Sequence, residues 1–284
     1  MLQSMTGFGK SEYNSELGEI TIEIKSLNSK NLDISFNIHP FFRSIENELR
    51  SFLSSVFFRG KIEFKISLST EESFAKINKN IIKQYINELN SVVKADEREL
   101  LKIAVNLPDA FSKQNLEISP SEKKQLINKI EKASEEVIDF RKKEGEFLEI
   151  DLLNQLQVIK NNLKEVILLA PKRIESTKNR LRKSFKVLEI ELNMDRFEQE
   201  LIYYLEKYDI NEEIVRLESH LDFFKKEITS EEAQKGKKLG FISQEIGREI
   251  NTIGSKANYS TIQVHVVEMK NSLEKIKEQL LNVL

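Results

Sequence analysis

Residues 121–166 read SEKKQLINKIEKASEEVIDFRKKEGEFLEIDLLNQLQVIKNNLKEV, and this stretch decides the fold. Its apolar residues recur at alternating intervals of four and three, the spacing of one face of an α-helix. The first run of this stripe comprises Leu126, Ile130, Ala133, Val137 and Phe140. A second run, in a shifted register, comprises Leu152, Leu156, Ile159, Leu163 and Val166. Such stripes indicate helices that pack on other helices, within one chain or between subunits.

The helical pattern continues to the end of the sequence. We expect Pro171 to begin a new helix, because proline is favoured in a first helical turn. Its apolar face comprises Leu181, Phe185 and Leu188. Two further stripes run through residues 214–228 and 239–253. The last stripe comprises Ile262, Val266, Met269, Leu273, Ile276, Leu280 and Val283.

The first third of the sequence has a different period. Alternation of apolar and polar residues, which is typical of half-buried strands, marks residues 19–25, 32–38 and 61–68. Residues 1–8 are a candidate fourth strand. Helical spacing marks residues 42–56 and is followed by helices near 78–95 and 97–106. We therefore predict an α+β fold that is predominantly helical overall. An N-terminal α/β domain over residues 1–115 precedes a long-helix domain over 116–284.

Composition excludes several classes of site. The chain of 284 residues has 44 Lys and Arg against 46 Asp and Glu, and it has no cysteine. Disulfides, a thiol nucleophile and a cysteine-ligated metal are therefore excluded. Because the net charge is only −2, a nucleic-acid site must be a local patch. The N-terminus shows no signal peptide, and the longest uncharged run, 257–267, is too short to span a membrane. We expect a soluble, cytoplasmic protein.

One local patch is strongly basic. Residues 160–186 hold nine basic and two acidic side chains, which favours a helix that binds a polyanion, although a solvated helix hairpin has the same composition.

Three positions interrupt the apolar stripes with polar residues. Continued past Phe140, the first stripe places Glu144 and Asp151 on the buried face, beside Gly145. Either the helix bends or ends at Gly145, or the two carboxylates face a cavity where they bind a cation or position Arg141.

The other two interruptions lie in the C-terminal third. Glu213, Arg216 and His220 form one column beside an apolar stripe. Glu and His side chains can bind a divalent metal or exchange a proton, and an Arg side chain can hold a phosphate. Glu245 and Arg248 form a second polar face in the next helix. From spacing alone, an ordinary surface ion pair is the favoured interpretation of the first column, and the second column is only a weak indication of a site.

Short motifs recur along the whole chain. The N-terminal third carries Ser4-Met5-Thr6-Gly7-Phe8-Gly9, Leu27-Asn28-Ser29-Lys30-Asn31-Leu32 and Arg59-Gly60-Lys61. The middle carries Arg141, Glu144-Gly145, Asp151-Leu152, Pro171 and Arg180-Leu181. The C-terminal third carries Asp209-Ile210-Asn211-Glu212-Glu213, Arg216-Leu217, Ser219-His220, Gly236-Lys237-Lys238-Leu239, Gln244-Glu245, Arg248-Glu249 and Asn251-Thr252-Ile253-Gly254-Ser255-Lys256. In order and spacing they resemble the YicC/YloC family of bacterial endoribonucleases, with departures at Gly240, Gly247 and Leu284.

The resemblance implies a divalent-metal-dependent endonuclease that cuts RNA and assembles as a hexamer. We expect the catalytic residues to be Glu213, His220, Glu245, Arg248 and Glu249. The expected ligands of Mn²⁺ or Mg²⁺ are Glu213, His220, Glu245 and Glu249, with Glu144 and Asp151 as further candidates. The expected RNA-binding residues are Arg216, Lys256, Lys172, Arg173, Arg180 and Arg182.

Two chemical routes and one rival function stay open at this point. The metal can activate the hydrolysis, or the ribose 2′-OH can attack with His220 as base. The rival is an RNA-binding adaptor that delivers small RNA to another nuclease without cutting it. Expected partners are RNA, further copies of this chain and other RNA-decay enzymes. A purely structural helical oligomer would show no salt-dependent affinity for RNA.

Overall fold

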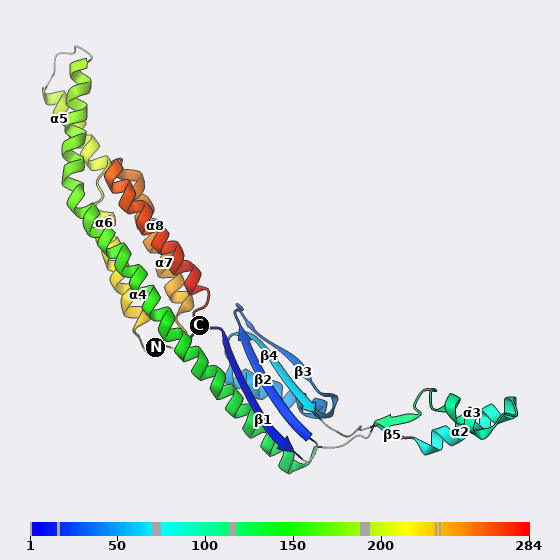
Figure 1. Ribbon diagram of the computed structural model, residues 1–284. Helices are drawn as coiled ribbons and strands as arrows, with labels where there is room; N and C mark the ends of the chain where they lie inside the picture. Colours follow the sequence, from blue (N-terminus) through cyan, green and yellow to red (C-terminus); the bar gives the residue numbers. More distant parts are fainter. Residues whose placement is uncertain are drawn as a thin grey trace.

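The computed structural model describes residues 2–15, 18–69, 75–113, 118–187, 194–230, 232 and 234–284. A single helix, α4 (Pro120–Val187), runs along most of the length of an elongated molecule (Figure 1). A sheet packs on its first half, two other helices pack on its second half, and a third helix packs on those two. The predicted α+β architecture, predominantly helical with a small N-terminal sheet, is confirmed.

Four strands form the N-terminal sheet in the order β1-β2-β4-β3. They are β1 (Gly7–Ser15), β2 (Gly18–Leu27), β3 (Leu32–Ile38) and β4 (Gly60–Ser69). All neighbours are antiparallel except β3 and β4, whose parallel pairing needs the crossover through the 3₁₀ helix η1 (Pro40–Ile45) and α1 (Glu46–Val56). The three predicted strands are confirmed. The fourth is 7–15, instead of 1–8.

One face of the sheet forms the first hydrophobic core. The alternating Ile20, Ile22 and Ile24 of β2 lie against α1 and the start of α4. Glycines on β1 allow this close approach, since a Cβ at Gly9 would stand 2.1 Å from the carbonyl oxygen of Ala133 in α4.

A small unit leaves the sheet after β4. Strands β5 (Ala75–Ile77) and β6 (Phe111–Lys113) pair, and α2 (Lys79–Val92) and α3 (Glu97–Ala104) lie between them in sequence. Ile82, Ala104 and Ala110 form its own small core. The helices predicted near 78–95 and 97–106 are confirmed.

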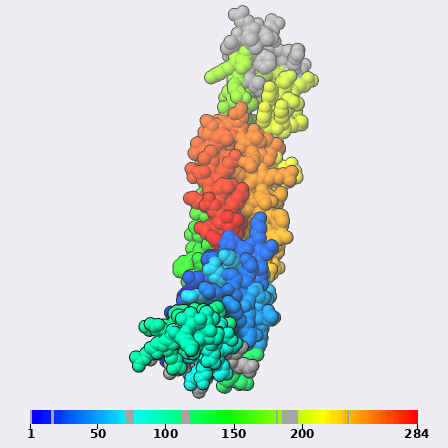
Figure 2. Space-filling model, turned by 90° about the vertical axis from the view of Figure 1, so that its right-hand side faces the viewer, coloured from blue at the N-terminus to red at the C-terminus, as the bar shows by residue number. Residues whose placement is uncertain are grey.

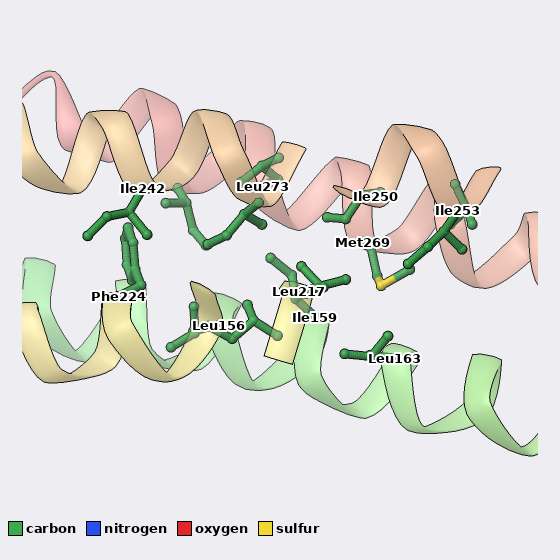
Figure 3. Packing of buried hydrophobic residues seen from close by; sticks show 14 of the residues in the cluster. Leu156, Ile159, Leu163, Leu217, Phe224, Ile242, Ile250, Ile253, Met269 and Leu273 are labelled. Atoms are coloured by element: carbon green, nitrogen blue, oxygen red, sulfur yellow. The ribbon is translucent and has the colours of Figure 1, made fainter. Parts of the chain in front are cut away.

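The second hydrophobic core is helical. It joins the latter part of α4 to α6 (Asn211–Ile228), α7 (Gly236–Lys256) and α8 (Ser260–Leu280). Figure 3 shows Leu217 and Phe224 of α6 facing Ile242 and Ile250 of α7. Every apolar residue predicted on the faces of these three helices is buried. The two cores meet inside α4, between Val137 and Leu152. The predicted domain boundary at residue 115 stays a prediction.

One expectation about α4 was wrong. Pro171 lies inside the helix and does not begin a new one. The hydrogen bond that it removes would have reached the carbonyl of Ile167, a residue on the exposed side of the helix. Phe185 and Leu181 lie in α4, outside the described side chains, and Leu188 lies outside the described residues. Helix α5 (Met194–Lys207) then leads back toward α6.

At Gly145, α4 does not end, but its register shifts, as one of the two alternatives allowed. The buried face moves from Val137 to Arg141 and Gly145, which leaves Phe140 and Phe147 exposed. Gly145 is needed because a Cβ there would stand 2.1 Å from the carbonyl oxygen of Leu2. The N-terminal segment therefore crosses α4 at this point. Ser4 forms a bridge with Val283, so both ends of the chain meet beside α4. No helix in the described ranges is long and apolar enough to cross a membrane.

Candidate functional site

Glu213 and Lys256 meet where α6 begins and α7 ends. Lys256 Nζ donates a hydrogen bond of 2.7 Å to Glu213 Oε1. Each residue lies at the helix end that its charge stabilises, the carboxylate in a first turn and the cation in a last turn. Glu213 is only 5% exposed, and its Oε2 is buried with no hydrogen-bond partner among the described residues. A buried acceptor without a partner is costly, and such atoms occur at functional sites.

Arg173 of α4 lies against the same helix end. Its Nη1 donates a hydrogen bond of 3.3 Å to the backbone carbonyl of Lys256. Burial lowers the pKa of the Arg173 guanidinium, and the nearby Asp209 carboxylate partly opposes that shift. The guanidinium therefore satisfies a carbonyl at the C-terminus of α7, where four carbonyls have no partner within the helix.

A small recess gathers three of the predicted RNA-binding cations. Arg173, Arg180 and Lys256 line it together. Tyr204 of α5 and Tyr208, just after it, also line the recess, and their rings stack at 6.0 Å between centroids with an angle of 8°. Cations beside a stacking surface suit a nucleotide, since phosphates need positive charge and bases need an aromatic face.

The two tyrosines were not among the predicted site residues. Their signal in the sequence is the spacing of four, which places two rings on one helix face. That signal becomes informative only once α5 is known to lie against the basic part of α4.

A polar seam continues from this recess between the antiparallel helices α6 and α7. Glu213 pairs with Lys256 at one end, and Glu227 pairs with Lys238 at 2.7 Å toward the other. His220 lies seven residues after Glu213, and Glu249 lies seven residues before Lys256. Seven residues are about two helical turns. Because α6 and α7 run antiparallel, His220 and Glu249 therefore lie at the same level of the seam. Glu249 is 4% exposed, and His220 is half-buried.

Other predicted site residues lie elsewhere. Arg216 faces solvent and pairs with Glu212 on the same helix. Glu245 and Arg248 form an exposed pair on α7, with 3.8 Å between the guanidinium and the carboxylate. Lys172 and Arg182 are exposed on α4. These are the ordinary surface arrangements that the spacing also allowed.

Glu144 and Asp151 do not share a cavity with Arg141. Glu144 accepts a hydrogen bond from the Thr6 hydroxyl, and Asp151 is half-exposed on α4. Arg141 donates instead to the Ser26 hydroxyl and, at 3.4 Å, to the backbone carbonyl of Met5. Burial lowers the pKa of the Arg141 guanidinium to about 10. This arginine therefore holds the N-terminal segment to the sheet.

The proposed metal ligands do not converge within one chain. In the described part of the molecule, no three His, Asp or Glu side chains lie close enough to share a cation. Glu213 is paired with a lysine, and Glu245 is exposed whereas Glu249, one turn further along α7, is buried. A single chain does not supply a complete metal site from these residues.

Comparison with known proteins gives the family. Residues 2–149 match the family model for the N-terminal region of YicC-like endoribonucleases, and residues 166–284 match the model for the C-terminal region. The chain belongs to the YicC-like endoribonuclease family. Over 291 residues it is 30% identical to a probable endoribonuclease YicC of Haemophilus influenzae, with all of both chains covered. Over 294 residues it is 29% identical to a probable endoribonuclease YicC of Clostridioides difficile, again with full coverage.

The first hydrophobic core lies within the N-terminal match, and most of the second lies within the C-terminal match. The N-terminal match ends at residue 149 and the C-terminal match begins at 166, both within α4. The recess and the α6/α7 seam both lie in the C-terminal region, together with most of the predicted site residues.

Proposed function

We propose that this chain is an endoribonuclease that requires a divalent cation, Mn²⁺ or Mg²⁺, and acts in RNA turnover. The observation that carries the proposal is the recess in which Arg173, Arg180 and Lys256 meet the stacked rings of Tyr204 and Tyr208. Family membership supports RNA as the polymer. Relatives of the same length are named as probable endoribonucleases.

In this proposal the recess holds the RNA chain and the seam carries the proton transfer. Lys256 and Arg180 neutralise phosphate charge, and a base stacks on Tyr208. His220 takes a proton from the attacking oxygen, and the leaving oxygen takes a proton from water. Glu249, at the same level of the seam, orients the imidazole and stabilises its cationic form, as a carboxylate does in a catalytic triad.

The cation is proposed to be held by more than one copy of the chain. Since the donors of one chain do not converge, the carboxylates of Glu245 and Glu249 need further donors from a second copy. This agrees with the proposed homohexamer, and exposed apolar residues such as Phe147 and Ile150 on α4 provide surface for assembly. A cytoplasmic location and association with other RNA-decay enzymes complete the proposal.

Cleavage of a purified RNA hairpin tests the function. We expect internal cleavage in the presence of Mn²⁺ or Mg²⁺ and none with excess chelator. A 2′,3′-cyclic phosphate end identifies attack by the ribose 2′-OH, whereas a 3′-hydroxyl or 5′-phosphate end identifies hydrolysis. His220→Ala should lower the rate by about 10²–10⁴-fold.

A matched variant keeps this test specific. Glu218 is exposed on the same helix and lies off the seam, so Glu218→Gln should cleave as the unmodified protein does. Equal rates for His220→Ala and Glu218→Gln would contradict the role of the seam. Binding without any cleavage would identify the chain as an adaptor and contradict the enzyme.

A further inference from the structure

A second cationic surface lies at the opposite end of α7 from the recess. A cleft of about 1210 Å³ separates the sheet from the helical core. The sheet contributes the β2–β3 connection and Arg59, the residue before β4, and the helical core contributes the start of α7 and the end of α8. Figure 2 shows this junction, where α7 and α8, in orange and red, meet the blue sheet.

Every charged side chain that lines the cleft within the described ranges is basic. These residues are Lys30, Arg59, Lys237, Lys238 and Lys277. Two of them are already paired with carboxylates outside the lining, Lys238 with Glu227 and Lys277 with Glu274, each at 2.7 Å. Lys30, Arg59 and Lys237 have no ion pair with any described residue, so no side-chain carboxylate neutralises these three cations.

The two walls of the cleft are fixed to each other. Asn28 Nδ2 donates a hydrogen bond of 2.6 Å to the carbonyl of Leu281, which ties the sheet to the segment after α8. Arg59 Nε donates to the carbonyl of Ser29 at 3.1 Å, which orients its guanidinium within the β2–β3 connection. Gly236 begins α7 against the backbone of Val283, where a Cβ would stand 2.3 Å from the carbonyl oxygen. The cations are therefore presented by a preformed surface.

The other lining residues suit a nucleic acid. Phe241 is 57% exposed and offers a ring for base stacking. The amide groups of Gln234 and Gln244, and the Oδ1 of Asn28, can hydrogen-bond to base edges or ribose. Isolated lysines favour any anion, but cations together with amides and an exposed ring favour RNA over an acidic protein surface.

We propose that this cleft is a second RNA-binding site, which holds a backbone segment away from the recess. The proposal rests on the proposed function, since it assumes an RNA substrate. Lys238 and Lys256 are 18 residues apart on α7, so the two sites are about 27 Å apart along the helix. At about 3.4 Å per stacked nucleotide, one RNA strand needs roughly eight nucleotides to reach both.

Salt-dependent RNA binding tests the cleft directly. The probe is a fluorescein-labelled 20-nucleotide single-stranded RNA, and its affinity is measured by anisotropy between 50 and 200 mM salt without added metal. Lys30→Gln/Lys237→Gln removes two uncompensated cations. The slope of log affinity against log salt should fall by about 1.4, because each phosphate contact on a single strand contributes about 0.7. At 100 mM salt the affinity should fall at least fivefold.

Lys143→Gln/Lys275→Gln is the matched control, because both lysines are exposed, outside the cleft and without an ion pair among the described residues. It should retain both affinity and slope. Equal affinities and equal salt slopes for the two double variants would overturn the proposed RNA-binding site in the cleft. Poly-glutamate serves as a model of an acidic protein surface. If Lys30→Gln/Lys237→Gln loses binding to poly-glutamate but keeps its RNA affinity, the RNA-binding site is overturned and the cleft is identified as a site for an acidic protein. Neither result says anything about cleavage. If RNA binds through the cleft but is never cut, the proposed endoribonuclease function is contradicted and the proposed binding site in the cleft still stands.

Discussion

Lys256 holds the buried carboxylate of Glu213 at 2.7 Å, across the junction between the end of α7 and the beginning of α6. Glu213 keeps only one of its two oxygens paired, and Lys256 stays one-third exposed beside the recess. The pair therefore both stabilises the helical core and presents a cation to a ligand. A phosphate that draws Lys256 away would leave Glu213 free to accept another donor.

The first prediction concerns this ion pair. Lys256→Met should lower the free energy of unfolding by about 2 kcal/mol, because a carboxylate is left buried without its partner. The double variant Glu213→Gln/Lys256→Met should lose clearly less than the sum of the two single variants, as urea unfolding will show. Additive losses would mean that the two side chains are not coupled.

The second prediction compares two helical glycines. Gly145→Ala should destabilise the protein by about 1–3 kcal/mol, since its Cβ would stand 2.1 Å from the Leu2 carbonyl oxygen and the N-terminal segment must move. Gly240→Ala should stabilise it by about 0.5–1 kcal/mol, because nothing lies within 4 Å of the added Cβ and alanine favours the helix. Urea midpoints that shift in the same direction for both variants would contradict the observed packing.

The pattern of apolar residues predicted most of the fold. Strands 19–25, 32–38 and 61–68 were evident because one face of the sheet is buried. The faces of α6, α7 and α8 were evident because each is buried along its whole length. The prediction at Pro171 was wrong for a physical reason. The proline removes a hydrogen bond to the carbonyl of Ile167, and the sequence does not show that Ile167 is on the exposed side of the helix.

Spacing alone did not separate the members of the polar columns. On an ideal helix, His220 lies about 20° around the axis from Glu213, whereas Arg216 lies about 60° away. That difference leaves Glu213 buried and His220 half-buried, while Arg216 reaches solvent and pairs with Glu212. The recess was unpredictable for another reason, because Tyr204 and Lys256 are far apart in sequence and meet only through tertiary packing.

The third prediction concerns pH. Burial raises the pKa of Tyr13 to about 12, and the Glu122 carboxylate adds to that shift. Because the pKa in the folded state is above the ordinary value of about 10, the unfolded chain loses this proton first. The stability that Tyr13 contributes is therefore complete below pH 10 and is lost as pH rises from about 10 to 12.

Tyr13→Phe removes this dependence. The difference in free energy of unfolding between the unmodified protein and the variant should decrease from pH 9 to pH 11, measured by urea denaturation. Absorbance titration of the folded variant should also lack one late-ionising tyrosine of the six in the chain. A difference in stability that stays constant over this range would contradict the raised pKa of Tyr13.

The fourth prediction concerns the stacked tyrosines. Tyr208→Ala should weaken binding of single-stranded RNA by roughly 5–100-fold, because one base–aromatic stack is worth about 1–3 kcal/mol. Tyr208→Phe keeps the ring and should bind as the unmodified protein does.

Tyr203 is exposed and outside the recess, so Tyr203→Ala supplies a control of matched size. Anisotropy with the 20-nucleotide RNA gives each affinity. Equal losses for Tyr203→Ala and Tyr208→Ala would place the stacking surface elsewhere, whereas a loss confined to Tyr208→Ala assigns it to the face beside Arg180 and Lys256.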